Sequence, residues 1–494
     1  MKEKIKMFFV NRKMLFASML FVLGCVFPLF IMEYSTDTYH LALSDIGKSI
    51  GDGMLSNGRF VTGMAAKLLS ALGFGIKGFY YFSLILAIFC MGAAIYELYK
   101  LLRSHMWRYG AFFLAIFTVC NPTTVEYFLF IEKGFFCFAI LMTVLSAKFF
   151  IRYLRGEKRV FLIFSYVCLP FSALTYQLIT SAFVTLAIVF IVIYSKSIKG
   201  FIANSAIAAS IFGYAYGIAF LALKIYNADN YRMTGEIKLS NMLKYFLITE
   251  RWWVILIYLA LALAVIAGFC IYSKKAYGRY FDETVMLNLL RLALILIAAG
   301  VAASVPFIFV KPEETWLCFR TAYALSVLPG ALGIWRFYKK PRVREKRVGP
   351  FHVLVRWKTI IMLSVISVTV IFYHTMIGSR LVNNVRDEAL CREIGAIIAE
   401  YENETGITVK KINIYYDSKI TQRNSGVLMI GDCNVRAFTR HWSDVSHMNL
   451  ILERSFARGK SAKYSKYFAS KDFNEFDRDE QMIFEGDTLH FCVY

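Results

Sequence analysis

Residues 176–195 read YQLITSAFVTLAIVFIVIYS, and none of them carries a charge. Residues 14–32, MLFASMLFVLGCVFPLFIM, are uncharged as well. About 20 apolar residues are enough for a helix to cross the hydrocarbon core of a bilayer. Similar runs recur along the chain and predict about ten or eleven transmembrane helices, near residues 14–32, 79–101, 109–131, 134–151, 160–172, 176–195, 201–225, 252–272, 286–310, 319–338 and 359–377.

The stretch 160–195 allows two interpretations. It forms either a tight hairpin of two short helices broken at Pro170 or one long tilted helix, because proline can break a helix or merely kink it. The alternation of basic and acidic loops described below is consistent only with the hairpin.

The composition excludes a soluble globular protein. Of the 494 residues, 58% are hydrophobic and 18% are charged. The mean hydropathy is +0.53. A soluble domain has roughly 45–50% apolar and about 25% charged residues. A chain of this length needs lipid to cover so much apolar surface.

The net charge of +22 does not indicate a nucleic-acid partner. From Arg380 to the C-terminus there are 16 basic and 17 acidic residues, which leaves 40 basic and 17 acidic residues before Arg380. That excess lies in short loops between apolar runs, where the positive-inside rule places it. No basic stripe alternates with aromatic residues as in a nucleic-acid groove. The charge therefore reports orientation in the membrane.

The loops predict a cytoplasmic N-terminus, following an uncleaved signal-anchor, in a protein of the cytoplasmic membrane. The most basic loop, KKPRVREKRVGPFHVLVRWK at 339–358, is then cytoplasmic. The outer loops are 33–78, 121–133, 226–251 and 311–318, and they hold most acidic residues of the membrane part. We expect a transmembrane domain over residues 1–377 and an extracytoplasmic domain over 378–494.

The C-terminal part is predicted to be a small α/β domain. Residues 383–406 read as a helix with Leu390, Ile394, Ile397 and Ile398 on one face and a stop at Gly406. TVKKINIYYD alternates like a strand, and GVLMIG and DTLHFCVY suggest two more. Cys391, Cys433 and Cys492 allow a disulfide here, although their odd number leaves the pairing open.

The long first outer loop contains two helical patterns. LALSDIGKSIGDGML places apolar residues at Leu41, Ile46, Ile50 and Leu55, which is typical of an amphipathic helix on a membrane surface. RFVTGMAAKLLSALGF is long enough to dip into the membrane but short for a complete span. A plain packed helix is an equally good interpretation of both.

Charged groups at the outer ends of spans are candidates for function, because charges inside lipid are costly. Glu33 and Asp37 follow the first span, and they would share one face if its helix continued. An ionised carboxylate near an acceptor hydroxyl is what a general base requires. The alternative is that both residues only cap and solvate a helix end.

Two further groups lie at the same boundary. NPTTVEYFLFIEKGFF contains Glu132 and Lys133, and an acidic residue at a helix start also complements the helix dipole. Arg59 and Arg320 are placed to bind a phosphate through paired hydrogen bonds, or equally a lipid headgroup. The polar pair Tyr176 and Gln177 lies within an apolar run, where such groups cross-link helices more often than they touch substrate.

The order of these motifs resembles the serotype-converting O-antigen glucosyltransferases of type II. Those enzymes have an Asp-Asp pair after the first span, a Gly-Arg pair after the loop helix, Asn-Pro and Tyr-Asp before the fourth span, and later Tyr-Gln and Pro-Arg pairs. The chain has the corresponding motifs over roughly residues 30–340, with NGRF at 57–60 and LTYQ at 174–177. It departs from the pattern at Thr38, which replaces the second Asp, at Glu132, which replaces Asp, and at Phe319, which replaces Pro.

The resemblance implies a GT-C-like polytopic membrane glycosyltransferase. Such an enzyme moves a hexose, glucose in the family, from a polyprenyl-phosphate donor to a surface glycan on the outer face of the cytoplasmic membrane. Asp37 would deprotonate the acceptor hydroxyl, with Glu33 and Glu132 as further catalytic carboxylates. Arg59, Arg320, Tyr176, Gln177 and Lys133 would bind substrate. The departures leave open whether a divalent metal takes part.

Two other classes fit the same layout. A transporter or flippase of lipid-linked sugars also needs many spans and interfacial arginines, but the sequence shows no internal repeat of the kind that many transporters have. A non-catalytic membrane assembly protein would use the outer domain as its working part. The sequence does not identify the sugar or the acceptor.

Overall fold

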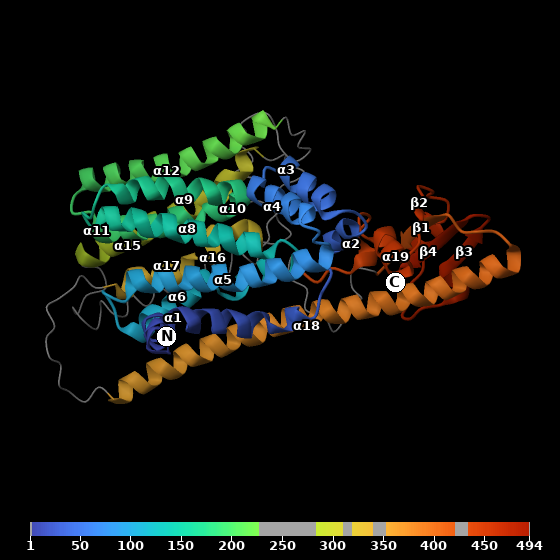
Figure 1. Cartoon of the computed structure of the whole chain (residues 1–494), viewed down its shortest axis with the longest axis horizontal. Coiled ribbons are helices and arrows are strands. Elements are labelled where there is room, and N and C mark those ends of the chain that lie inside the picture. Colours follow the sequence, from blue (N-terminus) through green and yellow to red (C-terminus); the bar gives the residue numbers. More distant parts are fainter. Residues whose placement is uncertain (1, 227–282, 310–318, 339–351, 420–432, 494) are drawn as a thin grey trace.

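The computed structural model describes residues 2–226, 283–309, 319–338, 352–419 and 433–493. Long helices form a bundle, and a smaller unit of strands and short helices lies beyond one end of it (Figure 1). We call this end of the bundle the domain-side end. The expected span 252–272 and the expected strand GVLMIG lie outside the described residues.

The elements follow one another in this order: α1 Lys2–Val26, η1 Phe27–Phe30, α2 Thr36–Ala42, η2 Gly47–Asp52, α3 Gly53–Ser56, α4 Phe60–Ala71, α5 Ile76–Leu102, α6 Arg108–Val119, η3 Pro122–Thr124, α7 Val125–Phe128, α8 Lys133–Leu154, α9 Val160–Thr175, α10 Gln177–Thr180, α11 Ala182–Tyr194, α12 Ile198–Ile225, α15 Glu283–Ser304, η5 Val305–Phe309, η7 Phe319–Ala322, α16 Tyr323–Ser326, α17 Leu328–Phe337, α18 His352–Thr405, β1 Lys411–Tyr416, η9 Ala437–Thr439, α19 Asp444–Leu452, β2 Ala457–Arg458, α20 Ser465–Ala469, α21 Arg478–Gln481, β3 Met482–Glu485 and β4 Thr488–Val493.

Seven helices of the described parts are long and apolar enough to cross a membrane, and an eighth span results if the bent pair Arg108–Val119 and Pro122–Phe128 counts as one. The polytopic helical architecture expected from the sequence is confirmed at this level. The expected span 109–131 bends by 41° where Asn121 and Pro122 interrupt it. The expected span 319–338 is divided into η7, α16 and α17.

The stretch 160–195 forms two helical arms, α9 and the consecutive pair α10 and α11, as the hairpin interpretation requires, but the break is not at Pro170. Pro170 lies inside α9, and the chain turns at Tyr176, whose backbone is extended at φ −159° and ψ 104°. Gln177 bonds to Gly58 at the domain-side end, whereas Tyr194 bonds to Arg155 at the opposite end. Residues 177–194 therefore run along the depth of the bundle, antiparallel to α9.

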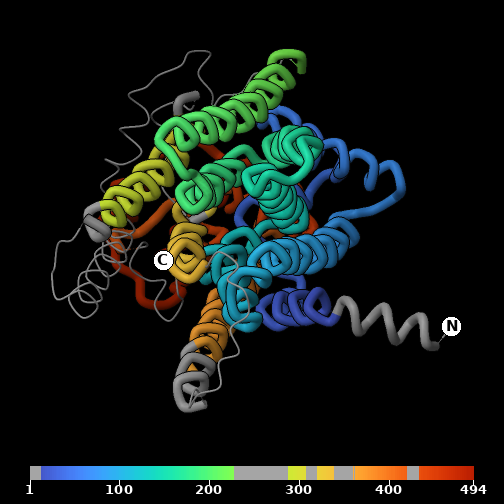
Figure 2. Tube along the Cα trace, turned by 90° about the vertical axis from the view of Figure 1, so that its left-hand side faces the viewer, coloured from blue at the N-terminus to red at the C-terminus, as the bar shows by residue number. Residues whose placement is uncertain are grey.

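The core of the bundle is assembled around α8, which packs on α5 and α9. Buried hydroxyl pairs join α8 to α9, with Thr143 2.8 Å from Ser172 and the side-chain oxygens of Ser146 and Ser165 2.9 Å apart. Such interhelical hydrogen bonds hold helices together where lipid removes the hydrophobic driving force. An end-on view shows the helices side by side around this centre (Figure 2).

The N-terminal end of α8 is fixed against α5. The Gly134 N–H donates to the Ser83 hydroxyl at 2.8 Å, and a side chain at position 134 would meet the Ser83 carbonyl oxygen at 2.4 Å. Only glycine fits this approach. It sets the position of the two residues just before it, Glu132 and Lys133.

The first loop forms short helices that pack together at the domain-side end (Figure 1). Ile46, Ile50 and Leu55 are buried, as expected for the inner face of an amphipathic segment. In contrast, Met64 and Leu68 of α4 are more than half exposed on the same helix face. This exposed apolar stripe is typical of a helix that contacts lipid.

Helix α18 connects the bundle to the smaller unit without a break. It has 54 residues, which corresponds to ~80 Å at about 1.5 Å per residue. The hydrocarbon core of a bilayer is only about 30 Å thick. A helix of this length does not fit within the hydrocarbon core. It continues past the bundle into the smaller unit (Figure 1), and the domain boundary expected at 377/378 falls inside it.

The smaller unit, which we call the α/β unit, has a four-stranded sheet in the order β2-β1-β4-β3. Strand β1 is parallel to β2 and β4, and β3 is antiparallel to β4. The strands expected from TVKKINIYYD and DTLHFCVY are confirmed as β1 and β4. Leu390, Ile394, Ile397 and Ile398 of α18 pack in one core with the sheet, and α18 ends before Gly406, at φ +70°. Cys391, Cys433 and Cys492 are buried thiols.

Candidate functional site

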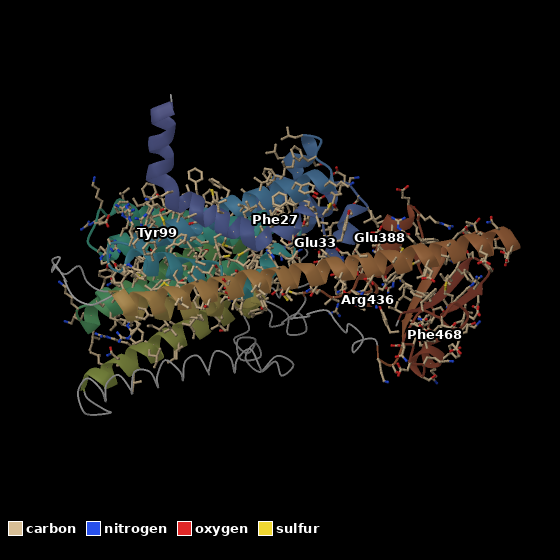
Figure 3. The ribbon with its side chains drawn as sticks, turned by 90° about the horizontal axis from the view of Figure 1, so that it is seen from below. Phe27, Glu33, Tyr99, Glu388, Arg436 and Phe468 are labelled. Carbon is tan, nitrogen blue, oxygen red and sulfur yellow. The ribbon has the colours of Figure 1, made fainter. Side chains whose placement is uncertain are left out.

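The residues singled out from the sequence gather at the domain-side end of the bundle. Glu33 lies at the junction between the bundle and the α/β unit (Figure 3). Arg59 contacts both Tyr176 and Glu132, and Lys133 contacts Glu33. The structure therefore brings together residues that are far apart along the chain.

Glu33 and Asp37 do not share a helix face, and this expectation is wrong. Helix α1 ends at Val26, a 3-10 turn containing Pro28 follows, and α2 begins only at Thr36. Glu33 lies in the extended connection and is buried, whereas Asp37 in the first turn of α2 is exposed. The helix is capped by Ser35 and Thr38, whose side chains bond reciprocally to each other's backbone. Neither carboxylate is needed as the cap.

Glu33 belongs to a buried charge cluster. Its Oε1 lies 3.6 Å from Lys133 Nζ, and its Oε2 lies 4.0 Å from Arg380 Nη1. Lys133 Nζ lies 3.6 Å from the centre of the Tyr80 ring, a cation–π contact. Lys133 is fully buried and Glu33 is 2% exposed. Because a buried charge without a partner is costly, this cluster ties the first loop to α8 and α18.

A second cluster joins Arg59, Glu132 and Tyr176. Arg59 Nη1 donates to Glu132 Oε1 at 3.1 Å, and its guanidinium lies 4.6 Å from the centre of the Tyr176 ring. Glu132 occupies the N-cap position of α8 but forms no capping hydrogen bond. Its carboxylate is directed to Arg59 instead, so helix capping does not account for it.

Asp37 lies within electrostatic reach of this second cluster. Burial raises the pKa of the Glu132 carboxyl, and the negative charge of Asp37 raises it further. The positive charges of Arg59 and Arg320 act in the opposite direction. Two carboxylates and two guanidinium groups therefore share one electrostatic environment, and Asp37 is the exposed carboxylate in it.

Arg320 is held in a third cluster. Its Nε lies 3.7 Å from Glu126 Oε1, and its backbone N–H donates to Glu126 Oε2 at 2.8 Å. The Tyr127 hydroxyl donates to the Arg320 carbonyl at 2.7 Å, and the guanidinium lies 4.3 Å from the centre of the Phe130 ring. The segment around Asn121 and Pro122 thus orients Arg320 as well as the start of α8.

Gln177 has the cross-linking role that an amide in an apolar run commonly takes. Its side-chain Nε2 donates to the Gly58 carbonyl at 2.9 Å, and its backbone carbonyl accepts from the Tyr216 hydroxyl at 2.8 Å. Gly58 adopts φ +74°, and a side chain there would meet Gln177 Nε2 at 2.8 Å. The tight turn at Gly58 allows this contact and places Arg59 over Tyr176.

Sequence patterns did not identify Tyr80 and Arg380 as members of the site. Tyr80 is one aromatic residue among many in an apolar helix. Arg380 is one basic residue among several in a polar helical stretch. The one signal was the spacing of Arg380 from Asn383, Asn384 and Asp387, which places four polar side chains on one face of the helix.

The described residues contain no group of three or more His, Cys, Asp or Glu side chains gathered as a metal site. The buried carboxylates of Glu33, Glu126 and Glu132 each lie near a guanidinium or ammonium group.

The α/β unit contacts the first loop through His447. This side chain is fully buried, and its ring meets the ring of Tyr39 in α2 edge to face at 4.4 Å and the ring of Phe438 at 5.1 Å. Within the described parts of the chain, neither ring nitrogen makes a hydrogen bond of ordinary geometry. Burial lowers the pKa of His447, and the nearby Asp387 offsets only part of that shift.

We expect the contact between α2 and the α/β unit to weaken in acid. Because the pKa of His447 is lowered in the folded state, the unfolded state binds a proton first as the pH falls below about 6.5. The contribution of neutral His447 to the free energy of unfolding is therefore fully present above that pH. Below it, this contribution decreases by at most about 1.4 kcal/mol per pH unit. The measurement is thermal unfolding at about pH 7.5 and about pH 5.5 for the wild type and for His447→Phe. If the unfolding temperature fell equally in both proteins at the lower pH, His447 would not be the cause of the acid sensitivity.

No model of a known protein family matches the chain, and a search of the curated proteins finds no match.

Proposed function

We propose that the chain is a membrane glycosyltransferase that moves a hexose, glucose by resemblance, from a polyprenyl-phosphate donor to a cell-surface glycan. The reaction takes place at the domain-side end of the bundle, which we assign to the outer face of the cytoplasmic membrane. One observation carries the proposal. Arg59 and Arg320 are held at the domain-side end of the bundle, where the exposed carboxylate of Asp37 lies within electrostatic reach of Glu132, the partner of Arg59.

The location suits a lipid-linked donor. Its polyprenyl chain is apolar and remains among the spans, whereas its phosphate lies at the boundary where Arg59 and Arg320 are held. Their side chains are 18% and 15% exposed, so both are partly accessible. A guanidinium binds phosphate oxygens through two parallel hydrogen bonds and remains charged throughout the reaction.

The chemistry requires few groups. The acceptor hydroxyl oxygen attacks the anomeric carbon of the hexose, and Asp37 takes the hydroxyl proton. The bond between that carbon and the phosphate oxygen breaks, and polyprenyl phosphate leaves with the electron pair. Because the arginines stabilise the negative charge on the leaving phosphate, no general acid and no nucleotide site are needed.

The contacts assign different roles to the remaining residues. Glu132 and Tyr176 hold Arg59, and Glu126 holds Arg320. Glu33 and Lys133, which their place at the outer ends of spans made candidates for catalysis and substrate binding, form the buried structural cluster. We retain the GT-C-like arrangement as part of the proposal.

Replacing Arg59 by lysine tests the proposal, because lysine keeps the positive charge but lacks the planar guanidinium that donates two parallel hydrogen bonds. We expect the KM for polyprenyl-phosphate hexose to rise about tenfold, which corresponds to one charge-assisted hydrogen bond. The measurement is the initial rate of transfer in nanodiscs as a function of donor concentration.

Arg152 provides a matched control at the opposite end of α8. It too pairs with a glutamate, Glu157, at 2.6 Å, and its guanidinium lies 3.6 Å from the centre of the Phe161 ring. Arg152→Lys should leave the donor KM unchanged. A donor KM that is unaffected by Arg59→Lys, or raised equally by both variants, would contradict phosphate binding by Arg59.

A further inference from the structure

A polar stripe runs along α18 between the bundle and the α/β unit. Arg380, Asn383, Asn384 and Asp387 are spaced so that they share one face of the helix. Each binds a segment that is distant in sequence. Asn383 donates to the Asn434 carbonyl, and Asp387 accepts from Arg436 and from the Ala437 N–H, both at 2.8 Å. The stripe therefore holds irregular backbone in place.

Asn384 makes the most specific of these contacts. Its Oδ1 accepts from the Tyr34 N–H at 2.8 Å, and its Nδ2 donates to the Tyr34 carbonyl at 2.9 Å. Both backbone groups of one residue are thus paired with one amide side chain, as a neighbouring strand would pair them. Nδ2 also lies 3.1 Å from the Tyr39 hydroxyl.

The clamped segment leads directly into α2. Residues 32–35 have no regular secondary structure, so they lack the repeating backbone hydrogen bonds that a helix or strand would give them. Ser35 caps α2, and Asp37 lies in the first turn of that helix. The rings of Tyr34 and Tyr39 stack at 5.1 Å, which couples the clamped residue to the body of α2. The direction in which Asp37 points thus depends on where Tyr34 is held.

We propose that Asn384 is a positioning residue for the transfer reaction, which holds Asp37 against the donor site by clamping the backbone of Tyr34. The role of Asp37 rests on the proposed function, whereas the clamp itself does not. It follows that α18, which continues into the α/β unit, is part of the active-site scaffold.

Asn449 is a matched control in the same region of the protein. Its Oδ1 accepts from the Phe456 N–H at 2.8 Å, and its Nδ2 donates to the Phe456 carbonyl at 3.0 Å. It therefore forms the same two-bond amide clamp, but between α19 and the segment before β2. Loss of either clamp removes the same pair of amide–backbone hydrogen bonds, and Asn384 loses its contact with the Tyr39 hydroxyl as well. Only the Asn384 clamp holds the segment that leads directly to Asp37.

The first arm of the test needs no activity. Amide hydrogen exchange, followed by mass spectrometry, is measured over residues 33–42 in the wild type, Asn384→Ala and Asn449→Ala. We expect faster exchange in this segment for Asn384→Ala alone. The variant Asn384→Asp keeps the acceptor for the Tyr34 N–H and should give a smaller increase. Unchanged exchange in Asn384→Ala would overturn the clamp.

The second arm measures transfer kinetics. Asn384→Ala should lower kcat about 10- to 100-fold while the donor KM stays unchanged, because a small displacement of a reacting group is costly. Asn449→Ala should keep the wild-type kcat. The double variant Asn384→Ala/Asp37→Asn should be no slower than Asp37→Asn alone. If the two substitutions acted independently, so that their fold-losses in rate multiplied in the double variant, the positioning role would be overturned.

The two arms separate the two claims. If the wild type transfers no hexose, the proposed function fails, and hydrogen exchange alone then decides whether Asn384 clamps the segment. If the wild type transfers hexose but exchange and kcat are both unaffected by Asn384→Ala, the positioning role fails and the proposed function stands.

Discussion

Asp37→Asn should remove sugar transfer while leaving the protein folded. The amide has nearly the same size as the carboxyl group but does not accept the proton of the acceptor hydroxyl. A positioned general base contributes about 10²- to 10⁴-fold to the rate, and we expect a loss in this range. Asp37 is exposed and is not needed to cap α2, so the substitution should leave the unfolding temperature unchanged. The measurement is the single-turnover rate of transfer from saturating donor.

Asp52→Asn is the matched control for this experiment. Asp52 also lies in the first loop and is exposed, and its Oδ1 pairs with Lys67 at 2.6 Å. Its replacement should keep the wild-type rate. An Asp37→Asn protein with full activity would show that another group, or none, takes the proton.

Lys133→Met should destabilise the protein more than any surface substitution. Methionine has a similar length, but among the residues that the structure describes it leaves the buried carboxylate of Glu33 with Arg380, at 4.0 Å, as its one charged partner. Breaking a buried ion pair by removing one partner costs about 3–5 kcal/mol. We expect a marked fall in the unfolding temperature of the detergent-solubilised protein. The double variant Glu33→Gln/Lys133→Met should recover part of it, because no buried carboxylate is then left without Lys133, while Arg380 keeps its hydrogen bonds to Asn434 and Tyr34.

Lys148→Met is the comparison on the same helix. Lys148 pairs with Glu97 at 2.6 Å, but both side chains are partly exposed, at 16% and 19%. Water can therefore solvate Glu97 after the substitution, and the loss should be smaller. Equal losses for the two lysine variants, or no recovery in the double variant, would show that the Glu33 cluster is not the structural link described above.

The elements that follow from local pattern were predictable. Long uncharged runs define spans without any knowledge of their neighbours, because lipid requires each spanning helix to satisfy its own backbone. The end of α18 at Gly406 and the strands β1 and β4 likewise follow from local signals. The helix of the first span does not continue to Asp37, since a 3-10 turn containing Pro28 follows α1, and the irregular residues 32–35 precede α2.

The location of the candidate site was predictable from the sequence, but the pairing of its carboxylates with its cationic side chains was not. Residues such as Arg59 and Glu132 were recognised because charges at span ends are costly unless they have a function or a partner. Which carboxylate pairs with which cation depends on helix packing, and a single sequence carries no signal for that. The part played by α18 was missed for the same reason, because Arg380 and Asn384 contact the first loop across about 350 residues of chain.

The most direct test of the proposed function follows labelled sugar. Purified protein in nanodiscs is incubated with radiolabelled polyprenyl-phosphate glucose and extracted cell-envelope glycan, beside a panel of other hexose donors. We predict that label moves from lipid to glycan with the wild-type protein. If no donor of the panel transfers label, while the labelled lipid crosses the bilayer of proteoliposomes containing the protein, the chain moves lipid-linked sugars instead, and the transferase assignment is contradicted.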